Sequence, residues 1–140
     1  MKKVFSIFVI GLVILFQVSQ AEAVDYYVGN DKNGDTVYLM TETISKKDFE
    51  PSEEMKAGQW VFAYDMKFKS VSRKNKVTFF DSTIYYGFEA LGLYEDTEGN
   101  FQCMNHSGKV NPRYNDDKNI YRAEIMSKAF KYLFDNNYLN

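Results

Sequence analysis

The sequence predicts an α+β fold, an antiparallel meander of about five to seven strands with a C-terminal helix packed on one face. Between residues 59 and 72, apolar and polar side chains alternate with a period of two, which is typical of a strand with one wet face. Short apolar segments separated by turn residues follow up to residue 105. From residue 119 the apolar period changes to that of a helix.

Residues 1–23 are predicted to form a secretory signal peptide. Lys2 and Lys3 precede an apolar run at 4–16, and residues 21–23 match the A-x-A cleavage pattern. As a helix this run spans roughly 20 Å, less than the ~30 Å hydrocarbon core, so cleavage is favoured over an uncleaved membrane anchor. We therefore expect residues 24–140 to be one globular domain, exported by a bacterial cell to the periplasm, the surface or the exterior.

The charge balance and the aromatic content limit the class of partner. Removing Lys2, Lys3 and Glu22 from the 17 basic and 19 acidic residues leaves 15 and 18, a net charge of about −3. Such mild acidity argues against nucleic acid, whose phosphates favour a basic face. No later segment is apolar enough for a membrane span after signal cleavage. Aromatic residues, 17% of the chain, favour sheet structure and a filled core, or else an exposed aromatic surface that binds a partner.

The first half of the mature chain is predicted to contain one hairpin and one long strand. Strands at 26–28 and 36–43 flank Asn33-Gly34, and both of these residues tolerate the positive φ of a tight turn. The charged segment 45–58 is predicted to be a loop, and loops of this length are often functional. In the strand at 59–72, the apolar face carries a regular set of side chains: Trp60, Phe62, Tyr64, Met66 and Phe68.

The second half continues the meander. After a polar turn at 73–76, strands are predicted at 77–80, 83–90 and 91–94, with Gly87 and Gly92 at bulges or bends. A turn at 96–100 leads into a strand at 101–105. In that strand Cys103 shares a face with Phe101, which favours burial of the thiol as a small hydrophobic group.

The predicted helix covers residues 119–136. Asp117 or Asn119 can cap its start, and Asn136-Asn137 can end it because asparagine tolerates the left-handed conformation. We expect one face to pack on the Trp60 side of the sheet. That face carries Arg122, Ile125, Met126, Ala129, Phe130, Leu133 and Phe134.

The sequence predicts no catalytic, cofactor-binding or metal-binding residue. The closest approach to a metal site is Asp31-x-Asn33-x-Asp35 with Glu42, which imitates the calcium loop of an EF-hand. The sixth position of that loop requires glycine for a sharp turn, and here it is Thr36. A hairpin turn is therefore the preferred interpretation.

The remaining candidate groups also favour structural interpretations. Cys103 and His106 are the sole cysteine and histidine, too few for a metal site, and they suit neither a Cys–His pair nor a serine triad. Asn105-His106-Ser107 fits an N-glycosylation sequon, which we interpret as chance in a bacterial chain. The basic turn at 73–76 with Lys67 and Lys69 is able to contact an anionic surface, although hairpin tips commonly have this composition.

Three short segments carry a resemblance to a known family. An aromatic pair in Asp25-Tyr26-Tyr27-Val28 precedes a glycine turn and the strand Thr36-Val37-Tyr38-Leu39, and Trp60-Val61-Phe62-Ala63 follows later. Over about residues 25–105 the chain resembles small exported bacterial domains of the surface-adhesin E-like kind. The resemblance implies an antiparallel sheet with helix cover and a binding or surface role. It transfers no functional residue.

We therefore expect a non-enzymatic exported protein that binds an unknown extracytoplasmic protein or glycan. Export, abundant aromatic residues and the lack of a pattern suited to chemistry favour this hypothesis. The alternatives are a small secreted hydrolase that uses carboxylates, and an inhibitor or subunit of a larger protein. Two convergent carboxylates in a cleft would favour the hydrolase, whereas an apolar surface patch would favour binding.

Overall fold

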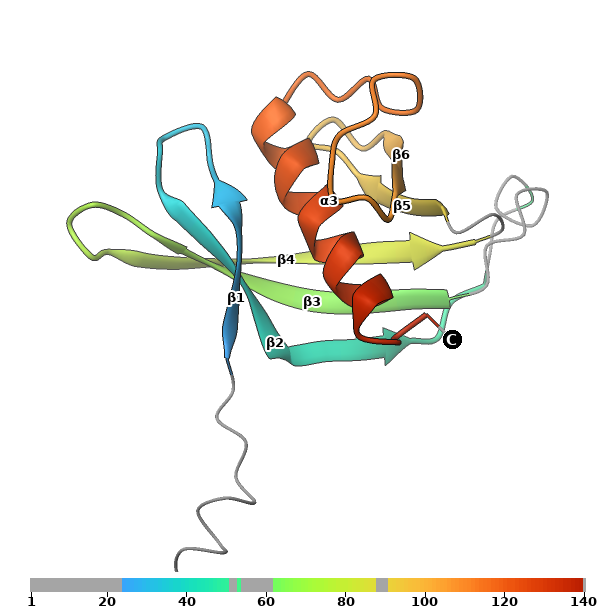
Figure 1. Ribbon diagram of the computed structural model, residues 1–140, viewed down its shortest axis with the longest axis horizontal. Coiled ribbons are helices and arrows are strands. Elements are labelled where there is room, and N and C mark those ends of the chain that lie inside the picture. The colour runs from blue at the N-terminus through green and yellow to red at the C-terminus, as the bar shows by residue number, and fades with distance from the viewer. Residues whose placement is uncertain (1–23, 51–52, 54–61, 88–90, 140) are drawn as a thin grey trace, which may run out of the picture.

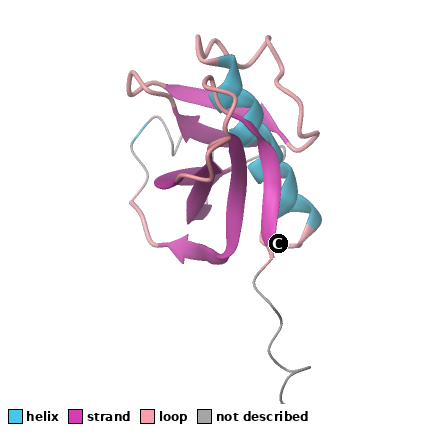
Figure 2. Cartoon of the chain, turned by 90° about the vertical axis from the view of Figure 1, so that its left-hand side faces the viewer, coloured by secondary structure: helices cyan, strands magenta, loops and turns pink. Residues whose placement is uncertain are grey.

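The computed structural model describes residues 24–50, 53, 62–87 and 91–139. Its strands follow one another in sheet order, and every neighbouring pair is antiparallel. The elements are β1 (Asp25–Asn30), β2 (Thr36–Lys47), β3 (Phe62–Val71), β4 (Val77–Tyr86), β5 (Leu91–Glu95), β6 (Phe101–Asn105) and α3 (Ile120–Asp135). The sheet curls into a half-barrel and α3 lies across one face (Figures 1 and 2). The predicted α+β meander is confirmed.

The core lies between α3 and the face of the sheet that it covers, here called the inner face. On β3 this face carries Tyr64, Met66 and Phe68, all buried. Trp60 and the rest of 59–61 lie outside the described residues. The helix contributes Ala123, Ile125, Met126, Ala129, Phe130 and Leu133, which are also buried. Each large apolar side chain buried in this layer contributes about 1.5–3 kcal/mol, so the layer holds the helix on the sheet.

The two ends of α3 agree with the sequence prediction, but one residue of its apolar face does not. The Asn119 side chain accepts a hydrogen bond from the Arg122 N–H at 3.3 Å and caps the first turn. Asn137 has a φ of 61° after the last turn. Phe134 was expected to face the sheet but is 37% exposed. Its ring stacks on His106, with centroids 4.0 Å apart, because it lies at the margin of the apolar stripe.

Three of the described hairpins share one five-residue turn, at 31–35, 72–76 and 96–100. In each, the first residue donates to the carbonyl of the fifth, and the fourth donates to the carbonyl of the first. The fourth residue has a positive φ: 80° at Gly34, 60° at Asn75 and 86° at Gly99. This is a type I turn followed by a left-handed residue. The sequence offered both Asn33 and Gly34 for the positive φ of this turn, and in the structure Gly34 adopts it.

β2 and β4 are longer than predicted. β4 runs unbroken from 77 to 86, whereas strands were predicted at 77–80 and 83–90; residues 88–90 lie outside the described part. β2 continues to Lys47 after an irregularity between Met40 and Ser45. There the Thr43 hydroxyl donates to the Met40 carbonyl at 2.6 Å and accepts the Lys67 N–H at 2.9 Å, so the ladder survives the extra residues.

Two expectations about β5 and β6 were wrong. Cys103 is only half-buried and Phe101 is 48% exposed, because the inner face of β6 carries Gln102 and Met104 instead. Gly92 is no bend: it pairs with Met104 inside β5 and lets α3 approach closely. The register shift that the structure shows in β1 lies between Tyr27 and Gly29.

Candidate functional site

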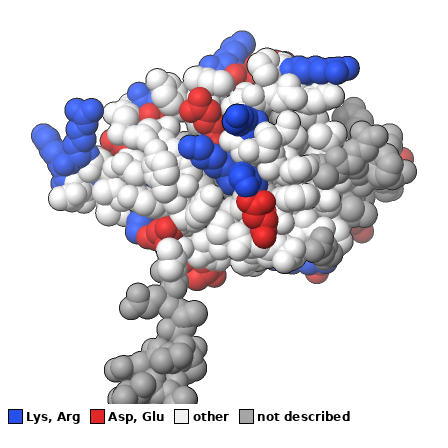
Figure 3. Space-filling view, viewed as in Figure 1, with Lys and Arg blue, Asp and Glu red and all other residues white. Residues whose placement is uncertain are grey.

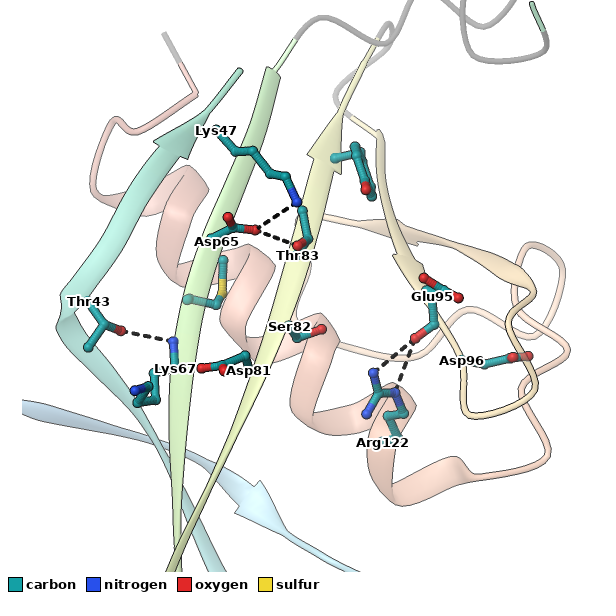
Figure 4. A pocket seen from close by; sticks show the side chains of 12 residues that line it. Thr43, Lys47, Asp65, Lys67, Asp81, Ser82, Thr83, Glu95, Asp96 and Arg122 are labelled. Atoms are coloured by element: carbon teal, nitrogen blue, oxygen red, sulfur yellow. Dashed lines mark hydrogen bonds and ion pairs between the residues drawn. The ribbon is translucent and has the colours of Figure 1, made fainter. Parts of the chain in front are cut away.

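The sheet splits where β4 and β5 meet. These strands pair only at Tyr85–Leu93 and Tyr86–Gly92 and then diverge. A pocket of about 570 Å³, here called the β4–β5 cleft, opens where these strands diverge and extends over the outer face of β2 and β3 (Figure 4). Arg122 reaches into the cleft from α3 and donates to the carbonyl of Glu95 on β5, at 3.0 Å from Nη2 and 3.3 Å from Nε.

The hydrogen-bond phase of β4 follows from the two turns at its ends. The Ser72 N–H donates to the Lys76 carbonyl at 3.0 Å, so these residues form a hydrogen-bonded pair, and such pairs recur at every second residue of an antiparallel ladder. On the β5 side the bond from the Gly87 N–H to the Leu91 carbonyl gives the same phase. The even-numbered residues of β4 therefore bond to β3. The odd-numbered residues Val77, Phe79, Asp81 and Thr83 direct their N–H and C=O groups away from β3, and of these four Asp81 and Thr83 line the cleft.

This stretch of β4 is an open sheet edge within the part of the chain that the structure describes. β5 pairs with none of residues 77–84, and the opposing Glu95 carbonyl is occupied by Arg122. The outer strands are covered: β1 lies against α3 through Tyr26 and Tyr132, whose rings are 4.7 Å apart, and the Cys103 N–H of β6 donates to the Tyr114 carbonyl at 3.1 Å. An unpaired edge of this kind is a template for another strand.

Exposed apolar side chains lie at the start of the open edge of β4, and exposed basic side chains lie in the turn that precedes it. Val77 and Phe79 are 45% and 58% exposed and lie on the outer face, opposite to α3. The hairpin tip that precedes them carries exposed basic side chains, which gather at the left margin of Figure 3. They are Arg73, Lys74 and Lys76. Lys69, which was grouped with this tip in the sequence, instead forms an ion pair with Asp25.

Two carboxylates lining the cleft are held by structural hydrogen bonds. Asp65 accepts from the Thr83 hydroxyl at 2.5 Å and lies 3.7 Å from the Lys47 ammonium. Asp96 accepts the N–H groups of Asn100 and Glu98, both at 2.9 Å, and also the side-chain amide of Gln102. The hydrogen bond from the Asn100 N–H, more than any other, holds the pKa of Asp96 below its usual value. A carboxylate kept ionised in this way is a poor general acid.

Asp96 should make stability sensitive to acid. Its pKa is lower in the folded chain than the ordinary 3.8, so its stabilising contribution is present above pH 3.8 and is lost as the pH falls through the folded-state pKa. Asp96→Asn keeps an acceptor oxygen for the turn but removes the titration. We expect its melting temperature to fall less steeply than that of the wild type below pH 3.8. Parallel melting curves across this pH range would contradict the assignment.

The calcium-loop pattern lies in the β1–β2 turn. One oxygen of Asp31 accepts the N–H groups of Asn33 and Asp35, at 2.8 and 3.0 Å, and the other accepts from the Ser70 hydroxyl at 3.2 Å. Glu42 is exposed on β2. No cluster of three His, Cys, Asp or Glu side chains with metal-binding geometry occurs among the described residues. The hairpin interpretation is confirmed.

Cys103 and His106 have separate environments. Burial raises the pKa of the Cys103 thiol, which disfavours the nucleophilic thiolate, and the His106 ring stacks on Phe134. In the sequon, Asn105 accepts the Ser107 hydroxyl at 2.5 Å within its own turn. None of these groups lines the β4–β5 cleft.

No sequence signal marked the open edge of β4, because alternation along a strand is the same whether or not a neighbour pairs with it. Comparison with known proteins adds no candidate site, since no family model, curated protein or solved structure matches the chain. The resemblance to surface-adhesin E-like domains stays a prediction. Among the described residues, no helix has the length and apolar character needed to cross a membrane.

Proposed function

We propose that this chain is an exported, non-enzymatic binding protein that receives an extended segment of a partner polypeptide along β4. The observation that carries the proposal is the phase of β4, which turns the backbone groups of four alternate residues, 77 to 83, toward the side of the strand on which β5 does not pair with them. An added strand satisfies such groups by main-chain hydrogen bonds, while side-chain contacts supply specificity. Export is proposed from residues 1–23, which lie outside the described part.

The surroundings of the edge support a polypeptide strand as the partner. Each hydrogen bond to an added strand contributes about 0.5–1.5 kcal/mol. Val77 and Phe79 offer apolar surface on the outer face at alternate positions, matching the two-residue period of a strand. We favour binding over the carboxylate hydrolase because the open edge of β4 offers main-chain groups to an added strand, and because two of the four carboxylates that line the cleft, Asp65 and Asp96, are engaged in structural hydrogen bonds.

Proline substitutions at two adjacent residues of β4 test which backbone N–H groups face the open edge and which bond to β3. Asp81→Pro removes an N–H that faces the cleft, and we expect it to change the free energy of unfolding by less than about 0.5 kcal/mol. Ser82→Pro removes an N–H bonded to Met66 on β3 and should cost about 2 kcal/mol. Chemical denaturation measures both values. Equal losses in the two variants would show that the assigned phase is wrong.

Asp81→Pro then serves as the folded, edge-blocked control in a binding experiment. The probe is a displayed library of random ten-residue peptides, selected on the wild-type protein. We expect enriched peptides to lose at least tenfold in affinity for Asp81→Pro, and to slow amide hydrogen exchange at residues 77, 79, 81 and 83. Peptides that bind both proteins equally, or that protect other amides, would refute strand addition at this edge.

A further inference from the structure

We propose that the segment received by β4 has a defined order of side chains. From its N-terminus it carries a basic, an aromatic and an apolar residue, then any residue, a second apolar residue and an acidic residue. This inference rests on the proposed function, because it uses the same open edge, and it names the chemistry of the partner. The segment runs antiparallel to β4, opposite residues 76–81. It stops short of Thr83, because beyond this residue β5 already pairs with β4, at Tyr85 and Leu93.

The hydrogen-bond phase of β4 decides which partner residue faces which side of the sheet. Val77, Phe79 and Asp81 direct their backbone groups away from β3, so each forms a hydrogen-bonded pair with the added strand, and the partner residues of these pairs lie on the outer face. The residue opposite Phe80 belongs to a pair without hydrogen bonds, in which side chains approach more closely, and it lies on the inner face. The antiparallel direction continues the pattern of the sheet, in which every neighbouring pair is antiparallel.

A hollow of about 240 Å³ beside β4, here called the Phe80 hollow, receives the aromatic residue. Its lining comes from β4, the β1–β2 turn and the start of α3, and includes Phe80, Asp81, Asn33, Tyr121, Arg122 and Ile125. The side chain of Asp81 lies on the outer face, yet this residue lines the hollow as well as the β4–β5 cleft, so the hollow opens at the free edge of β4. A cavity of about 150 Å³ is able to bind benzene, so the hollow has room for one aromatic ring.

The walls of the Phe80 hollow suit an aromatic ring. The Phe80 ring stacks on Phe68 of β3, with centroids 4.9 Å apart and 8° between the planes, and a ring opposite Phe80 extends this row. Phe80 is only partly buried and Tyr121 is 45% exposed, so both have apolar surface left to cover. Arg122 closes the hollow toward β5, where the Glu95 carbonyl holds its guanidinium (Figure 4). Aromatic pairs across strands contribute more than their buried area alone, which favours phenylalanine over an aliphatic residue here.

On the outer face, the charge changes sign along the open edge. Asp81 is exposed and lies opposite Lys67 of β3, so a basic partner residue on its other side continues the alternation of charge. Phe79 and Val77, both exposed, favour apolar residues opposite them. Beyond Val77 the turn at 73–76 carries three exposed basic side chains (Figure 3), which favour an acidic residue at the C-terminal end of the segment. A strand with the reverse charge order meets like charges at both ends.

A synthetic peptide with the sequence Thr-Lys-Phe-Val-Thr-Val-Glu-Glu, labelled with fluorescein at its N-terminus, tests the predicted order. We expect it to bind the wild-type chain in a fluorescence anisotropy titration and to slow amide hydrogen exchange at residues 77, 79 and 81. The peptide with the reversed sequence, and the peptide with alanine in place of phenylalanine, should each bind at least about tenfold more weakly. Equal binding of the reversed peptide would overturn the antiparallel direction, and equal binding of the alanine peptide would overturn the role of the Phe80 hollow.

Variants at two exposed residues test the individual contacts. We expect Asp81→Lys to weaken binding at least about fivefold, and a peptide with glutamate in place of lysine to recover it. Tyr121→Ala should weaken the phenylalanine peptide at least about fivefold but the alanine peptide less than about twofold. Circular dichroism confirms that each variant is folded. Failure of the glutamate peptide to recover binding, or equal effects of Tyr121→Ala on both peptides, would overturn the assigned contacts.

The library selection distinguishes a failure of this inference from a failure of the proposed function. We expect the enriched library peptides to share the predicted order of side chains. If they protect the odd-numbered amides of β4 without sharing that order, and the synthetic peptide does not bind, strand addition stands and the predicted chemistry of the partner is wrong. If neither the library peptides nor the synthetic peptide protects these amides, strand addition at β4 fails as well.

Discussion

Replacing Phe130 with alanine is expected to lower the free energy of unfolding by about 3–5 kcal/mol, the range for removing a buried phenylalanine from a core. The Phe130 side chain is fully buried on the inner face of the sheet. Its ring lies 6.1 Å from that of Tyr86 on β4 and packs directly over Gly92 on β5. Phe130 thus contacts both strands at the point where the β4–β5 cleft begins, and its loss should leave a cavity there.

Phe134→Ala is the matched control, one helical turn further along α3. Phe134 is 37% exposed and stacks on His106, so its truncation should cost less than about 1 kcal/mol. Chemical denaturation of the two variants with a common slope gives the comparison directly. Similar losses for both would mean that the helix packs on the sheet through a different face from the one described.

The contrast between these two residues shows what the sequence is able to predict. Helical spacing and an asparagine cap predict α3 closely, because both signals are local to the chain. Phe130 and Phe134 are equally apolar and one turn apart, so the sequence placed both on the sheet. Only the position of α3 over β5, where Gly92 leaves room for a ring, decides which of them is buried.

The fold is predicted by short sequence motifs, whereas the candidate site depends on contacts between segments that are distant in the sequence. The Asp-x-x-Gly turns at 31–34 and 96–99 predict hairpins, because the carboxylate bonds to nearby N–H groups and glycine accepts a positive φ. The β4–β5 cleft depends instead on where two strands stop pairing. The sequence predicted an interruption of the strand at Asp81 and Ser82. In the structure β4 is continuous from 77 to 86, and it is β5 that does not pair with residues 77–84.

Gly92→Val is expected to destabilise the chain by about 3 kcal/mol, the upper end of the usual cost of overpacking. A Cβ at this position would lie 3.1 Å from two atoms of the Phe130 ring and 3.1 Å from the Met104 methyl group. The neighbours are fully or almost fully buried, so they have little space to move. Gly92→Ala, which adds only the Cβ, should cost about 1 kcal/mol, and this graded series distinguishes crowding from a general intolerance of change.

The same substitution should act on the β4–β5 cleft, because Gly92 belongs to one of the two residue pairs that join these strands. Pushing β5 away from Phe130 strains the Tyr86–Gly92 pair and its neighbour Tyr85–Leu93. We therefore expect the Leu93 amide, which bonds to β4, to exchange hydrogen at least tenfold faster in Gly92→Val, while amides of the β2–β3 ladder change only with global stability. Uniform acceleration across the sheet would show that β5 is not a separately stabilised element and that the cleft opens only when the whole chain unfolds.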